Sequence, residues 1–209
     1  MHADWYFDVI SPFAYLQFMQ LDKVTDRAEL TFKPVLFAGL LNANGQKGPA
    51  EIPSKRLFTY QMVTWMAKKR GVPFKMPEAH PFNPIRALRL CIALENDVEA
   101  VGAIYHAIWG ERHLPDNDTG WSAIQAAVGV SDGDALISDP AVKQQLIKNG
   151  EDALAANVFG VPSFVAEDNV FWGDDALGFF SDWLDDLSIL ENPEMEKLRT
   201  LPSSSERPR

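Results

Sequence analysis

Residues 3–16 of the chain read ADWYFDVISPFAYL, and this stretch decides how the fold begins. Its first part, Ala3–Ile10, is rich in aromatic and β-branched residues, which is typical of a short buried strand. Ser11 and Pro12 follow directly, and serine as N-cap with proline at the first helical position is a helix start signal. The stretch therefore predicts a strand that runs straight into a helix, which we expect to continue to about Val24.

The next part of the chain changes from strand to helix. A second strand is predicted at Glu29–Leu36, where Pro34 indicates a sheet edge or a strand end. Residues 37–53 have the composition of a loop, with several glycine, asparagine and proline residues. Residues 55–158 are mostly helical in pattern and contain no clear strand. The expected helices are Lys55–Arg70, ended by Gly71, then Pro84–Glu95, Glu99–Trp109, Ser122–Val128 and Pro140–Val158.

Strand patterns return at residues 163–166 (SFVA) and 170–172 (VFW), with a turn-forming triplet between them. After this hairpin we expect an amphipathic helix, capped by Asp174 and reaching about Leu187. The order is therefore βαβ, a long helical block, then ββα. A right-handed βαβ unit and a ββα unit together make the core of the thioredoxin fold. The sequence predicts an α/β, thioredoxin-like fold with a large all-helical insertion.

This order also predicts the domain organisation. We expect a discontinuous thioredoxin-like domain at residues 1–38 and 159–190, and a helical insertion domain at residues 39–158. Residues 191–209 have no hydrophobic repeat and end in proline, serine and charge, which is typical of a flexible tail.

The composition excludes several classes of protein. The 209-residue chain has a formal net charge of −10 at pH 7 and no basic cluster, so it is a poor candidate for binding nucleic acid or an anionic membrane. It begins without the pattern of a secretion signal, and no apolar run reaches the ~18 residues of a membrane helix, so we expect a cytoplasmic location. The single cysteine, Cys91, lies in a helical apolar pattern; a buried core residue is the favoured interpretation, and a reactive thiol is the alternative.

Ser11 stands where a helix presents unpaired N–H groups and the positive end of its dipole, which together stabilise an anion. Redox proteins of this architecture carry Cys-x-x-Cys here, whereas this chain has Ser11 and Ala14, so dithiol chemistry is excluded at the site. A hydroxyl at this position can donate a hydrogen bond to the thiolate of a bound ligand. The alternative is that Ser11 serves only as a helix cap.

Two later segments can complete a ligand site in this fold. Val161-Pro162 comes just before a strand, where a cis peptide bond would free the backbone of Val161 to pair with an extended peptide such as glutathione. At residues 172–175 (WGDD) a helix start can receive the α-carboxylate of a γ-glutamyl group, while an aspartate takes its ammonium. An ordinary trans turn and plain helix capping are the respective alternatives.

Three motifs in this order resemble those of the 2-hydroxychromene-2-carboxylate isomerases, which are relatives of the kappa-class glutathione transferases and of DsbA. They are YFDVISPFAY (residues 6–15), NVFGVPSFV (157–165) and VFWGDDAL (170–177). The similarity covers nearly all of residues 3–187, including the helical insertion and its HPFNP segment at residues 80–84.

The resemblance implies a role for each matching residue. Ser11 is implied as the catalytic serine, beside the sulfur of glutathione. Val161 and Pro162 are implied to hold the middle of glutathione through the Val161 backbone. The γ-glutamyl end is implied to be held by Trp172, Gly173, Asp174 and Asp175. The organic substrate is implied to contact Asn44, Ser54, Lys55 and Asn83, although Ser54 stands where some relatives carry asparagine.

The resemblance further implies glutathione as a cofactor that is not consumed, a small aromatic carboxylate as substrate, and a homodimer. The implied reaction is isomerisation of 2-hydroxychromene-2-carboxylate to trans-o-hydroxybenzylidenepyruvate in the breakdown of naphthalene-like aromatics. A kappa-like transferase that conjugates electrophiles and a non-catalytic binding module of the same fold are the alternatives. The histidines lack metal-site spacing, so no metal is expected; His80 lies either near the substrate pocket or in a surface loop.

Overall fold

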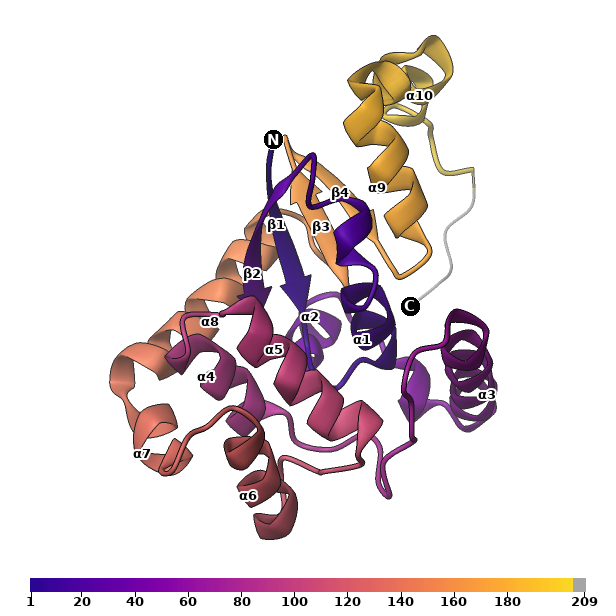
Figure 1. Cartoon of the computed structure of the whole chain (residues 1–209). Helices are drawn as coiled ribbons and strands as arrows, with labels where there is room; N and C mark the ends of the chain where they lie inside the picture. The colour runs from indigo at the N-terminus through magenta and orange to yellow at the C-terminus, as the bar shows by residue number, and fades with distance from the viewer. Residues whose placement is uncertain (205–209) are drawn as a thin grey trace.

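The computed structural model of the chain describes residues 1–204. A four-stranded mixed sheet lies at its centre, in the order β2-β1-β3-β4 (Figure 1). The strands are β1 (His2–Phe7), β2 (Glu29–Pro34), β3 (Ser163–Ala166) and β4 (Asn169–Trp172). β1 pairs with β2 in parallel and with β3 antiparallel, and β3 pairs antiparallel with β4. This topology confirms the predicted thioredoxin-like fold class, and Pro34 ends an edge strand as expected.

Helices surround the sheet and extend beyond one of its ends. The α-helices are α1 (Pro12–Phe18), α2 (Phe37–Ala43), α3 (Pro53–Arg70), α4 (Ile85–Ala93), α5 (Val98–Tyr105), α6 (Asp118–Ala127), α7 (Gly133–Ser138), α8 (Pro140–Ala155), α9 (Ala176–Asp185) and α10 (Pro193–Leu198). Short 3-10 turns occur at η1 (Leu21–Lys23), η2 (Pro49–Glu51) and η4 (Leu187–Glu191), and η3 (His106–Gly110) is a π-helical turn that continues α5.

Alternation along β1 divides the core between the two faces of the sheet. Trp5 and Phe7 point to one face, where the Trp5 ring stacks on Phe7 at 4.8 Å and meets Phe32 edge-on at 5.2 Å between ring centroids. Tyr6 points to the other face and packs in a smaller cluster with Leu40 of α2 and with α8. The sheet is therefore covered on both sides, as a thioredoxin-like core requires.

The chain between β2 and β3 is helical throughout its regular elements, which confirms the predicted all-helical insertion. In Figure 1 much of this segment lies below the sheet, at the end toward which the β1 arrow points. The loops that follow β1 and β2 therefore face the insertion. The exact domain limits at residues 38/39 and 158/159 stay a prediction.

The predicted loop over residues 37–53 is wrong, because residues 37–43 form α2 and residues 49–51 form η2. No side chain near the start of α2 caps it. Instead, the carboxylate of Asp8 accepts a hydrogen bond from Phe37 N at 2.9 Å, and Leu40 and Leu41 are buried. α2 therefore depends on contacts from distant parts of the chain, which local composition does not reveal.

Two predicted helix ends also need correction. α1 ends at Phe18 rather than near Val24, and the 3-10 turn η1 follows it. α9 starts after residues 172–175, but neither aspartate there caps it through a side chain. The carboxylate of Asp174 binds Arg70, and Asp175, at the N-cap position, makes no capping hydrogen bond.

Part of the predicted flexible tail is helical. Residues 193–198 form α10, whose first turn is capped by Asn192, a side chain that accepts from two backbone N–H groups. The flexibility of the tail stays a prediction, and residues 205–209 lie outside the described chain. The short helix α7 was also missed, although Asp132 caps its start as a local signal.

A prediction concerns Asn149, which ties α8 to the end of β2. The buried side chain donates from Nδ2 to Pro34 O at 2.9 Å and accepts from Gln145 Nε2 at 2.8 Å. Asn149→Ala leaves the Pro34 carbonyl without this donor, so urea denaturation should show a loss of about 1–3 kcal/mol in the free energy of unfolding. Lys148→Ala, on the exposed side of the same helix, is the control and should cost clearly less, because its ion pair with Asp152 lies in solvent. Equal losses in the two variants would contradict this account.

Candidate active site

Ser11 begins α1 at the point where the loop after β1 turns into the helix. It is the N-cap residue, with extended backbone angles, and its Oγ accepts a hydrogen bond from Ala14 N at 3.2 Å. Within residues 1–204 no acceptor is recorded for the Ser11 hydroxyl, so its proton is available to a ligand. Ser11 is therefore a helix cap and, at the same time, a donor at the amino end of α1.

The loop that carries Ser11 is held by side chains of the helical insertion. Three consecutive backbone carbonyls accept hydrogen bonds from three such side chains. The pairs are Tyr105 Oη to Asp8 O at 3.4 Å, Trp109 Nε1 to Val9 O at 2.9 Å and His80 Nε2 to Ile10 O at 2.9 Å. Because buried carbonyls need partners, the insertion fixes the path of the chain into α1.

His80 contributes both of its ring nitrogens to this arrangement. Since Nε2 donates to Ile10 O, Nδ1 is the acceptor of the Tyr60 hydroxyl, 2.8 Å away. Burial lowers the pKa of His80, and the positive charge of Arg56 adds to this, against the opposing effect of the hydrogen bond to Ile10. The ring is therefore neutral at pH 7 and serves as a support for the loop. Of the two places predicted for His80, near the substrate pocket or in a surface loop, the structure favours the first, because His80 lines the cavity described below.

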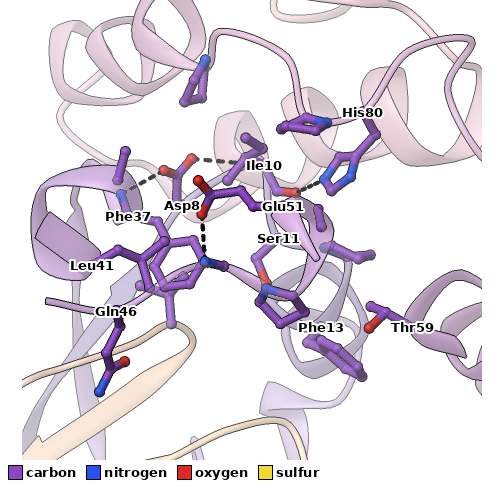
Figure 2. Close-up of a pocket in the computed structure, with 18 of the residues that line it drawn as sticks. Asp8, Ile10, Ser11, Phe13, Phe37, Leu41, Gln46, Glu51, Thr59 and His80 are labelled. Atoms are coloured by element: carbon purple, nitrogen blue, oxygen red, sulfur yellow. Dashed lines mark hydrogen bonds between the residues drawn. The ribbon is translucent and has the colours of Figure 1, made fainter. Parts of the chain in front are cut away.

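The side chain of Asp8 is a second support that sequence reasoning missed. Figure 2 shows its carboxylate between two backbone N–H groups, those of Ile10 at 3.0 Å and Phe37 at 2.9 Å. Asp8 is completely buried. Burial raises the pKa of this carboxyl from 3.8 to about 7, although both hydrogen bonds act in the opposite direction. One group thus joins the Ser11 loop to the start of α2, and its charge changes near neutral pH.

The Val161–Pro162 peptide bond is cis, which is the first of the two alternatives that the sequence left open. Pro162 O accepts a hydrogen bond from Gly173 N at 2.9 Å, and Gly173 O accepts from Gln17 Nε2 of α1 at 2.8 Å. Gly173 has a φ of 99°, a conformation that L side chains rarely adopt. Its peptide groups therefore connect the cis-proline loop, the 172–175 segment and α1.

Asp174 is buried and forms a two-pronged ion pair with Arg70 at the end of α3, with distances of 2.7 and 2.6 Å. Such paired contacts between guanidinium and carboxylate are strong and directional. The neighbouring Asp175 is exposed. The two aspartates therefore differ in what their carboxylates bind. The carboxylate of Asp174 is paired with Arg70, whereas the carboxylate of Asp175 takes no part in this ion pair.

A cavity of about 610 Å³ brings most of these groups together. Of the predicted site residues, it is lined by Ser11, Val161, Trp172, Gly173, Asp174 and Asp175. Its walls also include His80 and a set of residues that were not predicted as site residues: Asp8, Phe13, Phe37, Leu41, Gln46, Glu51, Thr59 and Phe82. Figure 2 shows how several of these side chains surround the region in front of Ser11. The recurring aromatic and leucine side chains form an apolar wall suited to an aromatic ligand.

The four residues predicted to contact the organic substrate do not line this cavity. Asn44 ends α2 and donates from Nδ2 to Leu40 O at 2.8 Å. Asn83 is exposed, and its side chain accepts from Ile85 N at 3.0 Å. Ser54 and Lys55 are exposed on the first turn of α3. Among the cavity-lining residues of the described chain no lysine or arginine occurs.

Cys91 is completely buried in α4, and burial raises the pKa of its thiol well above the ordinary value. The favoured interpretation of a core cysteine is confirmed. Within residues 1–204 no group of three or more metal-binding side chains comes together. None of the helices in this part of the chain has both the length and the apolar character to cross a bilayer.

Comparison with known proteins places the chain in a defined group. Residues 3–185 match the DsbA-like thioredoxin domain family. A protein of Sphingobium xenophagum named 2-hydroxychromene-2-carboxylate isomerase is 30% identical over 190 residues, 87% of this chain and 96% of that one. The protein of the same name from Pseudomonas putida is 28% identical, over 85% and 91% of the two chains. Glutathione S-transferase kappa 2 of Caenorhabditis elegans is 25% identical, over 76% and 77%.

Solved structures agree on the fold. A 2-hydroxychromene-2-carboxylate isomerase superposes with a TM-score of 0.77 at 23% identity, covering 93% of this chain and 99% of the other. The cytosolic disulfide reductase DsbM of Pseudomonas aeruginosa, solved with GSH, superposes with a TM-score of 0.60 at 14% identity, covering 95% and 100%.

The raised pKa of Asp8 predicts how stability depends on pH. Between 3.8 and about 7 the folded protein keeps a proton that the unfolded chain has lost, so the free energy of unfolding falls as pH rises through this window. The effect is at most on the order of 4 kcal/mol. Asp8→Asn does not titrate, so its free energy of unfolding, measured in urea from pH 4 to 8, should lack this decline.

Asp22→Asn, an exposed aspartate exchanged in the same way, is the control for the other titrating groups. It should keep the decline seen in the native protein. If Asp8→Asn and Asp22→Asn showed the same pH dependence, a protonated Asp8 at neutral pH would be ruled out.

Proposed function

Because this chain belongs to the DsbA-like thioredoxin family, and within it to the 2-hydroxychromene-2-carboxylate isomerases, we propose that it is a glutathione-dependent isomerase of such aromatic carboxylates. The relatives carry that name, and the cavity of this chain supports the same chemistry. The observation that carries the proposal is the position of Ser11 at the start of α1, in one cavity with Val161 and residues 172–175.

The residues present suit the three parts of glutathione. The sulfur would lie at the Ser11 hydroxyl. The cysteinyl backbone would pair with Val161, whose N–H and C=O form no backbone hydrogen bond within the described chain. The γ-glutamyl group would lie at the start of α9, between Trp172 and Asp175. Since Asp174 is already paired with Arg70, we assign the γ-glutamyl ammonium to Asp175.

When bound, glutathione supplies a sulfur nucleophile for reversible attack on a conjugated carbon of the substrate, and it is regenerated in each turnover. Ser11 donates a hydrogen bond to the sulfur and thereby favours its ionised form. The unpaired N–H groups and the dipole at the start of α1 add to this effect. The apolar wall around Phe13 and Phe37 would accommodate the aromatic ring of the substrate.

The assignment of Asn44, Ser54, Lys55 and Asn83 to the organic substrate stays a prediction. This assignment is supported in part by residues a few positions away in the sequence. Asn42, Glu51 and Thr59 line the cavity, so the predicted residues lie close to it along the chain. The proposal requires a shift of the segment around Lys55 if its ammonium is to reach the substrate carboxylate.

Ser11→Ala tests the proposed role of the hydroxyl. It removes one donor at the reacting sulfur, so kcat/KM for isomerisation of 2-hydroxychromene-2-carboxylate should fall about 10²- to 10³-fold. Native activity should require glutathione, whose concentration should stay constant during turnover. Ser122→Ala on the surface of α6 is the matched control and should leave the rate unchanged. Full activity of Ser11→Ala, or of the native protein without glutathione, would refute the proposal.

A kappa-like glutathione transferase is the second candidate, favoured by the kappa-class relatives. The same assay separates the two activities, because a transferase consumes one glutathione for each molecule of product released. Stoichiometric loss of glutathione with a conjugated product would favour the transferase, whereas a constant concentration favours the isomerase.

We further propose that the chain forms a homodimer and acts in the cytoplasm. Support for the dimer comes from α3, where Leu57, Phe58 and Trp65 are 62%, 61% and 56% exposed on one side of the helix. Exposed apolar groups gathered in this way mark interaction surfaces.

Trp65→Glu tests the proposed dimer contact. A charge in this apolar surface should convert the native dimer to a monomer in size-exclusion chromatography with light scattering. Leu198→Glu, at a similarly exposed position on α10, is the control and should stay dimeric. A monomeric native protein would refute the proposed dimer, and a Trp65→Glu variant that stays dimeric would exclude α3 as the contact.

A further inference from the structure

A second cavity of about 340 Å³ lies between α2, α4 and α8, apart from the proposed glutathione site. The two cavities have α2 in common. Phe37 and Leu41 of this helix line the first cavity, Gly39 and Leu40 line the second, and Leu36 lines both. The volume is within the lower range of sites that bind small organic molecules.

Much of the second cavity is apolar. The hydrophobic side chains that line it are Leu36, Leu40, Ile85, Leu146, Ile147 and Leu154. Ile147 and Leu154 of α8 keep 55% and 41% of their surface exposed, although they stand at the edge of a cavity that could bury them. A hydrocarbon group in the cavity would remove this surface from water, which is the main favourable contribution to binding apolar ligands.

Two of the residues that line the cavity are glycines. Gly39 of α2 and Gly150 of α8 both line it, and a Cβ added to either would have no atom within 4 Å. Neither has a positive φ, so their helices do not need glycine for its backbone. Glycine inside a helix costs about 1 kcal/mol relative to alanine. A side chain would therefore fit at both positions, beside the other residues that line the cavity.

The cavity also carries positive charge in a chain whose net charge is −10. Arg89 of α4 and Lys143 of α8 line it, and within residues 1–204 neither side chain has a recorded ion pair or hydrogen bond. Arg89 Nε is buried and has no hydrogen-bond partner. An anion in the cavity would instead meet the terminal nitrogens of the guanidinium and gain a charge-assisted hydrogen bond there. Glu151, also a lining residue, is exposed.

We propose that this second cavity binds a small amphipathic carboxylate, with its carboxylate against Arg89 and Lys143 and its hydrocarbon against α8. The planar guanidinium favours a carboxylate, since the two groups match in shape. The apolar lining favours a single hydrocarbon chain or ring over a polyanion. This site does not depend on the proposed isomerase activity, because it lies on the other side of α2.

Calorimetric titration of the full chain with octanoate tests the proposal. Octanoate should bind with a 1:1 stoichiometry, and octan-1-ol, which has the same chain without the charge, should bind at least about tenfold more weakly. Arg89→Gln should weaken octanoate binding by a similar factor. Arg86→Gln removes the same charge from the same helix outside the cavity and should bind as the native chain does. No binding below the micellar concentration of octanoate, or equal affinity in the two arginine variants, would overturn the proposal.

Filling the cavity gives an independent test. Gly39→Leu and Gly150→Leu each place a side chain in the open space from a different helix, and each should abolish octanoate binding. Thermal melting identifies any variant that fails to fold, and the other variant then decides. Octanoate binding that survives in a folded Gly→Leu variant would place the ligand elsewhere, for example in the first cavity, and would overturn the proposal.

Discussion

Three hydrogen bonds from side chains to backbone carbonyls hold the chain just before Ser11, and the active site depends on them. The carbonyls of residues 8–10 are bound by Tyr105, Trp109 and His80, all from the helical insertion. Within the thioredoxin-like core, Asp8 O also accepts from Ser11 N at 3.0 Å, whereas the described residues include no backbone donor to the carbonyls of Val9 and Ile10. The insertion therefore orients the amino end of α1 as well as covering it. The loop before Ser11 is held jointly by the core and the insertion.

The parts of the site that local chemistry determines were predictable from the sequence. Ser11 and Pro12 start α1 where their capping preferences place it, and Val161–Pro162 is cis where the chain enters β3. The order of the strands and helices then specifies which distant segments meet, because few topologies satisfy a βαβ unit followed by a ββα unit. The meeting of Ser11, Val161 and residues 172–175 in one cavity follows from that order.

The parts that depend on distant partners were not predictable. A carboxylate at the end of a strand has the same local sequence pattern whether it is exposed or buried, so the contact of Asp8 with α2 was missed. Asp174 resembles a helix cap in sequence, yet its partner, Arg70, is 104 residues away. Asn44 was expected to face a ligand, but its side chain satisfies a carbonyl at the end of α2. For Asp8 and Asp174 tertiary contacts override the local preference, whereas the partner of Asn44 is a carbonyl only four residues earlier in the chain.

The seven-residue helix α2 separates the two cavities and contributes residues to the lining of both. Its start is attached through Phe37 N to a carboxyl group whose proton occupancy changes near neutrality, and Leu36 forms part of both walls. A ligand in one cavity that displaces α2 therefore changes the volume of the other cavity. If both proposed ligands bind and either one displaces α2, each must change the affinity for the other by the same factor, and protonation of Asp8 is linked to both.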